Sequence, residues 1–231
     1  MRLVAAMVVR NEADRYLPMV LDDLERYCDA IVVLDDGSTD ATPEVCAAHD
    51  RVRLHRNGQS LFWSDEAALR GQLWALSLAL NPEWVLAIDA DEVMEQRFSW
   101  DLDALLSQRV YPVIGVHVHE FWGCTTHYRV DKLWNPVEKY TPMLVRNLPG
   151  LEPRFAPRAL HCGRIPAAVR GPMLRSGVRC KHFGYANPAD PPRKYQAYIA
   201  ADPHGRFCLR SHYESILDPP DQVVLERWTE I

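Results

Sequence analysis

The residues best suited to chemistry lie in a short acidic segment that follows an apolar run. The run from Trp84 to Ile88 ends in Asp89, Asp91 and Glu92, with a small alanine between the two aspartates. Alternate side chains of an extended segment share a face, so Asp89 and Asp91 could bind one hard cation. An ion bound by two carboxylates has coordination positions left for phosphate oxygens. Sites in which Mg²⁺ or Mn²⁺ binds a diphosphate have this arrangement. The alternative is a solvated acidic turn, because Asp-x-Asp triplets are common in surface loops.

A second segment also consists of an apolar run that ends in acidic residues. The stretch AIVVLDDGSTDATPEV predicts a buried strand over Ala30 to Leu34 that stops at Asp35 and Asp36 and turns at Gly37 before a capped helix. The carboxyl ends of parallel strands meet at one edge of a sheet, where ligands bind in open α/β folds. We therefore expect both acidic segments to face one cleft.

The elements that position these acids begin at the N-terminus. Leu3 to Val9 reads as a strand, followed by a polar loop and a helix whose apolar residues include Leu17 and Leu21. This is a βαβ opening. It contains neither G-x-G-x-x-G nor G-x-x-x-x-G-K-[ST], which argues against hydride transfer on a nicotinamide and against P-loop chemistry.

Four segments in order carry a family resemblance: MVVRNEADRYL, VVLDDGSTDAT, SDEAALRGQLWAL and WVLAIDADEV. Together they resemble the nucleotide-sugar half of a family 2 glycosyltransferase with a GT-A fold. The resemblance implies an α/β fold with a mixed, mainly parallel sheet flanked by helices. It also implies inverting transfer of a sugar from a nucleoside diphosphate donor, for which we expect UDP, to an acceptor nucleophile.

The resemblance also implies roles for matched residues. The base and ribose would be contacted by the loop after the first strand and by the end of the second, namely Val9, Arg10, Asn11, Glu12 and Asp35 or Asp36. Arg70 would lie beside the base or the diphosphate. Asp89 would sit at the ribose, and Asp89 and Asp91 at a Mn²⁺ or Mg²⁺ ion.

The later segment RCKHFGYANPADPPRKYQAYIAADP resembles a glycosyltransferase subgroup with a His-x-Gly-Tyr element. There the resemblance implies His182 as a further metal ligand, with Arg193 and Lys194 near the donor phosphates. Imidazole is a suitable ligand for Mn²⁺, and basic side chains would offset charge on the departing diphosphate. A purely structural role for His182 is the alternative.

The acceptor side is expected from about residue 113 onward, and the donor half from residue 1 to about residue 93, within one domain covering 1–231. A carboxylate there would take the proton of the acceptor as it attacks from the opposite sugar face. We place Asp131 first and Glu120 second for this role, although either could instead pair with a basic neighbour. Trp122 and Trp134 could stack on a sugar or simply fill space.

Composition limits the class of protein. The chain has 231 residues, 48% of them hydrophobic and 25% charged, with a net charge of -5, which is typical of globular proteins and argues against broad nucleic-acid binding. The run Leu3 to Val9 is too short for a signal sequence, and no stretch reaches the ~18 apolar residues of a membrane span. We expect a cytoplasmic protein that could dock on a membrane, with a small-molecule, glycan or lipid-linked acceptor.

The six cysteines are scattered, which favours reduced thiols. A zinc site from His161, Cys162, Cys180 and His182 is an alternative, although the spacing matches no zinc motif.

Two rival functions also stay open. A nucleotidyltransferase would need a Gly-rich basic N-terminal loop, which the sequence lacks, and a non-catalytic nucleotide-sugar binding module would not need the intact Asp89 and Asp91 pair. The sequence does not predict the oligomeric state.

Overall fold

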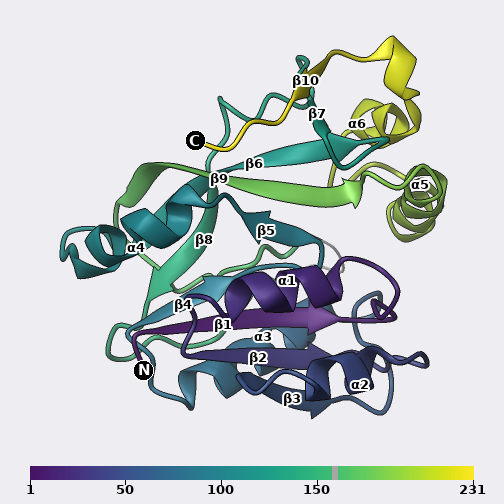
Figure 1. The fold of residues 1–231 in the computed structure, drawn as a ribbon. Helices are drawn as coiled ribbons and strands as arrows, with labels where there is room; N and C mark the ends of the chain where they lie inside the picture. The colour runs from purple at the N-terminus through teal and green to yellow at the C-terminus, as the bar shows by residue number, and fades with distance from the viewer. Residues whose placement is uncertain (158–160) are drawn as a thin grey trace.

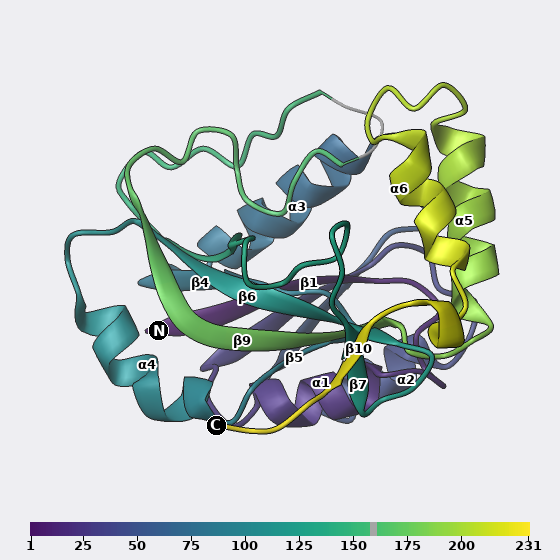
Figure 2. The same ribbon diagram turned by 90° about the horizontal axis from the view of Figure 1, so that it is seen from above.

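A mixed β-sheet forms the centre of the molecule, and helices cover it on two faces (Figures 1 and 2). The computed structural model describes residues 1–157 and 161–231. The strands are β1 (Leu3–Val9), β2 (Ala30–Asp35), β3 (Val52–Arg56), β4 (Trp84–Ala87), β5 (Glu92–Met94), β6 (Val113–Trp122), β7 (His127–Arg129), β8 (Thr141–Arg146), β9 (Met173–Tyr185) and β10 (Leu225–Arg227). The helices are α1 (Leu17–Leu24), α2 (Thr42–Ala47), α3 (Glu66–Leu78), α4 (Arg97–Ser107), α5 (Asp190–Ala201), α6 (Arg210–Glu214) and the short 3₁₀ turns η1 (Ser215–Leu217) and η2 (Pro220–Gln222).

The four strands β3, β2, β1 and β4 lie parallel and side by side, as the opening βαβ pattern predicts. Their register pairs Val9 with Asp35, so the carboxyl ends of β1 and β2 coincide. Beyond β4 the sheet continues through antiparallel β8 and β6. The expected mixed α/β sheet flanked by helices is confirmed, with its parallel strands concentrated in the first half of the chain.

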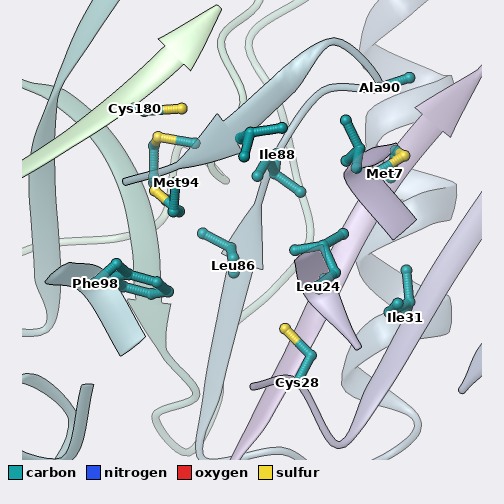
Figure 3. Packing of buried hydrophobic residues seen from close by; sticks show 14 of the residues in the cluster. Met7, Leu24, Cys28, Ile31, Leu86, Ile88, Ala90, Met94, Phe98 and Cys180 are labelled. Atoms are coloured by element: carbon teal, nitrogen blue, oxygen red, sulfur yellow. The ribbon is translucent and has the colours of Figure 1, made fainter. Parts of the chain in front are cut away.

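The core has two layers because alternate residues of each central strand face opposite sides of the sheet. Leu3, Ala5 and Met7 of β1 pack on the side of α1, whereas Val4 and Ala6 pack on the side of α3. Figure 2 shows α3 on one side of the sheet and α1 with α4 on the other. Figure 3 shows the α1 side, where apolar side chains from several elements meet. This packing gives the strand ends a rigid support.

The second half of the chain completes the sheet with a long parallel pair, β6 and β9, and with β5 antiparallel to β9. In this register His182 lies opposite both Glu92 of β5 and Glu120 of β6. The helices α5 and α6 lie side by side beyond the ends of these strands in both views (Figures 1 and 2). Glu92, Glu120 and His182, which are far apart in the sequence, are therefore neighbours across the sheet.

Among the helices of residues 1–157 and 161–231, none combines the length and the apolar character that crossing a bilayer requires.

Candidate active site

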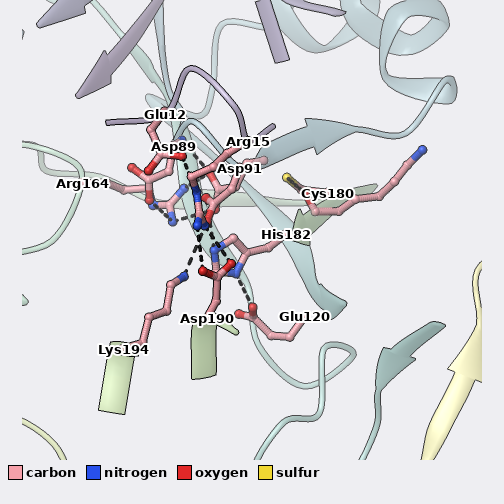
Figure 4. Close-up of polar contacts among 12 residues, drawn as sticks. Glu12, Arg15, Asp89, Asp91, Glu120, Arg164, Cys180, His182, Asp190 and Lys194 are labelled. Carbon is pink, nitrogen blue, oxygen red and sulfur yellow. Dashed lines mark hydrogen bonds and ion pairs between the residues drawn. The ribbon is translucent and has the colours of Figure 1, made fainter. Parts of the chain in front are cut away.

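A cluster of alternating positive and negative side chains lies where β4 passes into β5 (Figure 4). Asp89 follows β4, and Asp91 immediately precedes β5. The carbonyl oxygen of Asp91 accepts a hydrogen bond from the Phe183 amide at 2.8 Å, which ties this segment to β9. The acidic segment is thus a turn at the sheet edge, and its carboxylates are paired with basic side chains rather than freely solvated.

Asp89 faces two arginines. Arg70 Nη1 lies 3.3 Å from Asp89 Oδ1, and Arg164 Nη2 lies 3.5 Å from Asp89 Oδ2. Burial alone would raise the pKa of the Asp89 carboxyl, but the charges of Arg164 and Arg70 lower it. Asp89 is therefore an ionised carboxylate that is fixed from both sides.

Asp91 faces the basic groups of the second half of the chain. His182 Nε2 lies 3.3 Å from Asp91 Oδ1, and Lys194 Nζ lies 3.5 Å from Asp91 Oδ2. Burial would raise the pKa of Asp91, but the charges on His182 and Lys194 hold it well below its ordinary value. Gly184 leaves space for both bases, because a Cβ there would lie 2.6 Å from His182 Nε2 and would also meet Lys194 Nζ.

Glu120 contacts the other side of the same imidazole. Its Oε2 accepts a hydrogen bond from His182 Nδ1, and Figure 4 shows His182 between Asp91 and Glu120. Burial opposes a charged imidazolium, but the carboxylates of Glu120 and Asp91 outweigh it and raise the pKa of His182 well above its ordinary value. In return, the His182 charge lowers the pKa of Glu120 against the effect of burial.

The donor set fits a divalent ion only in part. Asp91 Oδ1 and His182 Nε2, 3.3 Å apart, have a separation suited to two ligands of one ion, since bonds of about 2.1 Å place adjacent ligands about 3 Å apart. Asp89, the third expected ligand, is directed to the arginines. Within residues 1–157 and 161–231, no group of three or more His, Cys, Asp or Glu side chains is arranged to hold a metal, the zinc alternative included. These residues suit an ion whose remaining ligands come from a diphosphate.

Asp131, which we placed first as the base, belongs to a different cluster. It accepts hydrogen bonds from Arg129 Nε at 2.5 Å and from the backbone amides of Leu133 and Trp134. Burial would raise the pKa of Asp131, but these bonds, led by the one from Arg129, lower it. The ordering of the two candidates is therefore reversed, since Glu120 alone of the pair is hydrogen-bonded into the charged cluster.

The two tryptophans belong to one buried aromatic cluster, and Trp134 also lines a cavity beside Glu120. Trp122 and Trp134 are buried and pack against Tyr185, and the Arg129 guanidinium lies 4.6 Å from the centre of the Trp122 ring. Arg129 itself is buried and donates to the Ser215 carbonyl oxygen. These side chains form one buried cluster around Trp122, at the end of β6.

Asp35 and Asp36 are fully buried and hydrogen-bonded to their own chain. Asp35 accepts from the Ser38 amide and from Arg56 Nε. Asp36 accepts from Ser60 Oγ at 2.6 Å and from the amides of residues 61 and 62. Both aspartates therefore shape the loops at the strand ends, and any contact with a ligand would compete with these bonds.

The loop after β1 is fastened at several points. Arg10 donates to Ser60 Oγ, and Asn11 adopts a left-handed backbone with φ of 54°, which asparagine tolerates better than most residues. The Val9 side chain is buried in the core, so only its backbone is near the loop. Burial raises the pKa of Glu12, which pairs with Arg15.

Arg15 connects this loop to α5. It binds Asp190 through two nitrogens at 2.7 and 2.9 Å, and Arg193 also contacts Asp190 at 3.0 Å. The two basic residues predicted on α5 therefore separate: Lys194 reaches Asp91, whereas Arg193 pairs with Asp190 and is mostly exposed. No local pattern in the sequence indicates the pairing of Arg15 with Asp190.

A cavity of about 320 Å³ opens next to the charged cluster. Its lining includes Glu120, His182 and Arg164 together with Tyr140 and Lys139. Glu120 and His182 are thus accessible both to the acidic segment and to a space large enough for part of a second substrate.

Arg164 and Glu92 are the site residues that sequence reasoning missed. Arg164 forms two hydrogen bonds with Glu92, at 2.7 and 3.0 Å, and also faces Asp89. Arg164 lies in an irregular segment with no motif. The only available signal was Glu92 itself, an acid in an apolar strand that would need a basic partner when buried.

Comparison with known proteins gives a family match over most of the first two-thirds of the chain. The family model described as Glycosyl transferase family 2 matches residues 5–156. Two uncharacterized proteins, one from Mycobacterium tuberculosis and one from Mycobacterium bovis, are each 28% identical to this chain over 224 residues. Each alignment covers 93% of this chain and 54% of the relative, so the chain spans about half the length of these relatives.

Two solved structures are similar over 94% of this chain, each with a TM-score of 0.52. One is TarS from S. aureus, at 14% identity and 69% coverage of that chain. The other is the mannosyltransferase PcManGT from Pyrobaculum calidifontis in complex with GDP-Man and Mn²⁺, at 15% identity and 68% coverage. At these identities the similarity establishes a common fold.

Proposed function

The chain belongs to glycosyl transferase family 2 and has the GT-A fold, and from that premise we propose that it transfers a sugar from a nucleoside diphosphate to an acceptor hydroxyl with inversion. One observation carries the proposal. Asp89, Asp91, His182 and Glu120 converge at the sheet edge beside a cavity. Carboxylates that face basic groups on one side and a cavity on the other suit a reaction between an anionic donor and a neutral acceptor.

The donor nucleotide would lie along the ends of β1 and β2. The fastened loop of residues 9–12 and the segment of residues 60–62, which Asp36 holds, would line the site of the base and ribose, with Arg70 and Asp89 beyond them. In this proposal Asp36 acts mainly by holding residues 60–62. UDP is the nucleotide we expect first, and PcManGT, which binds GDP-Man, makes GDP the next to test.

The diphosphate would lie between Asp91 and the basic side chains of His182 and Lys194. Their positive charges would bind the phosphate oxygens and stabilise the nucleoside diphosphate as it departs. A Mn²⁺ or Mg²⁺ ion would be held by Asp91 and by His182 only after His182 Nε2 has lost its proton, and the charge of the ion would then replace that of the imidazolium. PcManGT, a structure of the same fold, contains Mn²⁺.

Glu120 would serve as the general base. The acceptor hydroxyl enters from the cavity, its oxygen forms a bond to the anomeric carbon, and the bond from that carbon to the diphosphate oxygen breaks. The hydroxyl proton passes to the Glu120 carboxylate. Glu120 is ionised near neutral pH, as a proton acceptor must be, and its lowered pKa makes it a weaker base than an unpaired glutamate. Attack from the face opposite the diphosphate inverts the anomeric centre.

A thermal-shift screen of UDP, GDP, dTDP and CDP with Mn²⁺ tests the donor site. A ligand at about 100 times its Kd stabilises the native state by about 2.7 kcal/mol, which corresponds to a rise in Tm of about 5 to 10 °C for a chain of this size. No shift with any of the four would contradict the proposal.

Hydrolysis of the matching nucleotide sugar, with and without Mn²⁺, then separates the rival functions. A glycosyltransferase releases nucleoside diphosphate slowly even without its acceptor. A binding module shifts Tm without turnover, and a nucleotidyltransferase cleaves at the α-phosphate of a nucleoside triphosphate.

A further inference from the structure

Two glutamates in one short segment each hold an arginine in the protein interior. Glu92 accepts two hydrogen bonds from Arg164, at 2.7 and 3.0 Å. Glu95 accepts from the Arg179 amide at 2.7 Å and from Arg179 Nε at 2.9 Å. Both glutamates are 1% exposed. Buried charges destabilise a protein unless they are paired, so both pairs matter for the fold.

Only the first pair contacts the acidic segment. Glu92 Oε2, besides binding Arg164, accepts a hydrogen bond from the backbone amide of Asp89 at 2.9 Å. Arg164 then reaches the Asp89 carboxylate with Nη2 at 3.5 Å. Glu92 therefore controls the backbone of Asp89 directly and its side chain through Arg164. Figure 4 shows Arg164 beside Asp89.

The arginines that hold Asp89 have a common support. The backbone carbonyl oxygen of Arg164 accepts a hydrogen bond from Trp74 Nε1 at 2.9 Å. Trp74 is a fully buried residue of α3, the helix that also carries Arg70. Arg70 and Arg164 therefore approach opposite oxygens of Asp89 from positions fixed against one helix. This arrangement restricts the rotation of the carboxylate.

We propose that Glu92 and Arg164 are positioning residues that hold Asp89 at the angle at which it meets the donor nucleotide. The inference rests on the proposed function, because it takes Asp89 to contact the donor. Removing a supporting group leaves the carboxylate present but free to turn, and displacement by about 1 Å can reduce activity ~10²-fold. Loss of a partner that orients a binding group typically weakens binding or activity about 10- to 100-fold.

The second Glu–Arg pair supplies matched controls. We compare Arg164→Lys and Glu92→Gln with Arg179→Lys and Glu95→Gln, measuring Tm by circular dichroism and UDP affinity by calorimetry, with Mn²⁺ and in EDTA. All four variants should lose stability, because each weakens a buried pair. Only the first two should lose UDP affinity, about tenfold or more, and the loss should persist in EDTA because it acts through Asp89.

A double-mutant cycle shows whether Arg164 acts through Asp89. In an Asp89→Ala background, Arg164→Lys should cause no further loss of UDP affinity, since the group to be positioned is gone. If Glu92→Gln does not fold, the double variant Glu92→Gln/Arg164→Gln, a neutral pair of similar volume, replaces it.

Wild-type UDP affinity in folded Arg164→Lys and Glu92→Gln would overturn the positioning role. So would equal losses of affinity in all four variants, which indicate a general effect of stability. The proposed function fails separately, if the wild-type protein binds none of the four nucleoside diphosphates.

Discussion

Replacing Gly184 by alanine would test whether the charged cluster needs the space that this glycine leaves. The Gly184 backbone does not have a positive φ, so alanine is acceptable to the main chain and the effect comes from the added carbon. That carbon would lie 2.6 Å from His182 Nε2 and 2.7 Å from His182 Cε1, and it would overlap Lys194 Nζ. Contacts between such atoms are normally about 3.5 to 4.0 Å, so the neighbours must move by about 1 Å.

The two neighbours will respond differently. Lys194 is the end of a flexible chain and can swing away from Asp91, whereas His182 is held by its strand and by Glu120. Overpacking of this kind costs about 1 to 3 kcal/mol of stability. A misplacement of about 1 Å in a catalytic site can lower turnover ~10²-fold. We expect Gly184→Ala to fold, with UDP affinity in Mn²⁺ and the rate of nucleotide-sugar hydrolysis each reduced at least tenfold.

Gly177→Ala is the matched control. Gly177 lies in the same strand, its φ is not positive, and a Cβ there meets no atom within 4 Å. Calorimetry with UDP, the hydrolysis rate and thermal unfolding are measured for both variants. If Gly184→Ala and Gly177→Ala bind and turn over equally, the space beside His182 has no functional role and the geometry argued above is wrong.

Four further predictions each concern the replacement of individual acidic or histidine side chains. Asp91→Ala should abolish Mn²⁺-dependent UDP binding by calorimetry while far-UV circular dichroism stays native; unchanged affinity would contradict it. Glu120→Gln should lower transfer ~10² to 10⁴-fold with UDP affinity nearly unchanged, whereas Asp131→Asn should mainly lower Tm; the reverse pattern would restore Asp131 as the base. Asp36→Ala should cost about 1 to 3 kcal/mol in urea unfolding and weaken UDP binding in EDTA as well, because three donors lose their acceptor; a neutral result would deny its structural role. Burial lowers the pKa of His119 to about 4, so the stability that it contributes is full above about pH 6.5 and is lost as the pH falls toward 4; His119→Gln should flatten that part of the pH profile of urea unfolding.

Features that depend on local patterns could be predicted from the sequence. The apolar runs of β1, β2 and β4 are buried, and parallel pairing brings their acidic ends to one edge. The alternating residues of β6 and the two prolines at the start of α5 are local patterns of the same kind. For these elements, periodicity and turn residues carry enough information because a buried face imposes its period on the sequence, whichever element covers it.

Features that depend on register and on distant partners could not be predicted. His182 meets Glu120 because β6 and β9 pair in one particular register, and no sequence rule specifies that register. Asp131 ranks first as the base from the sequence, and its pairing with Arg129, two residues away, is an alternative that the sequence leaves open. Arg164 reaches Glu92 across 72 residues of chain, from a segment that has no regular structure.

The division of charge between the two halves of the chain has a consequence for biosynthesis. Asp89, Asp91 and Glu92 leave the ribosome well before Arg164, His182 and Lys194, which pair with them, whereas Arg70, the other partner of Asp89, precedes them. The parallel strands of a nascent chain can pair, but three carboxylates at their edge repel one another until β9 and α5 arrive. A nascent or truncated chain that ends before Arg164 therefore lacks most of the positive side of the charged cluster, even where its first strands are already formed.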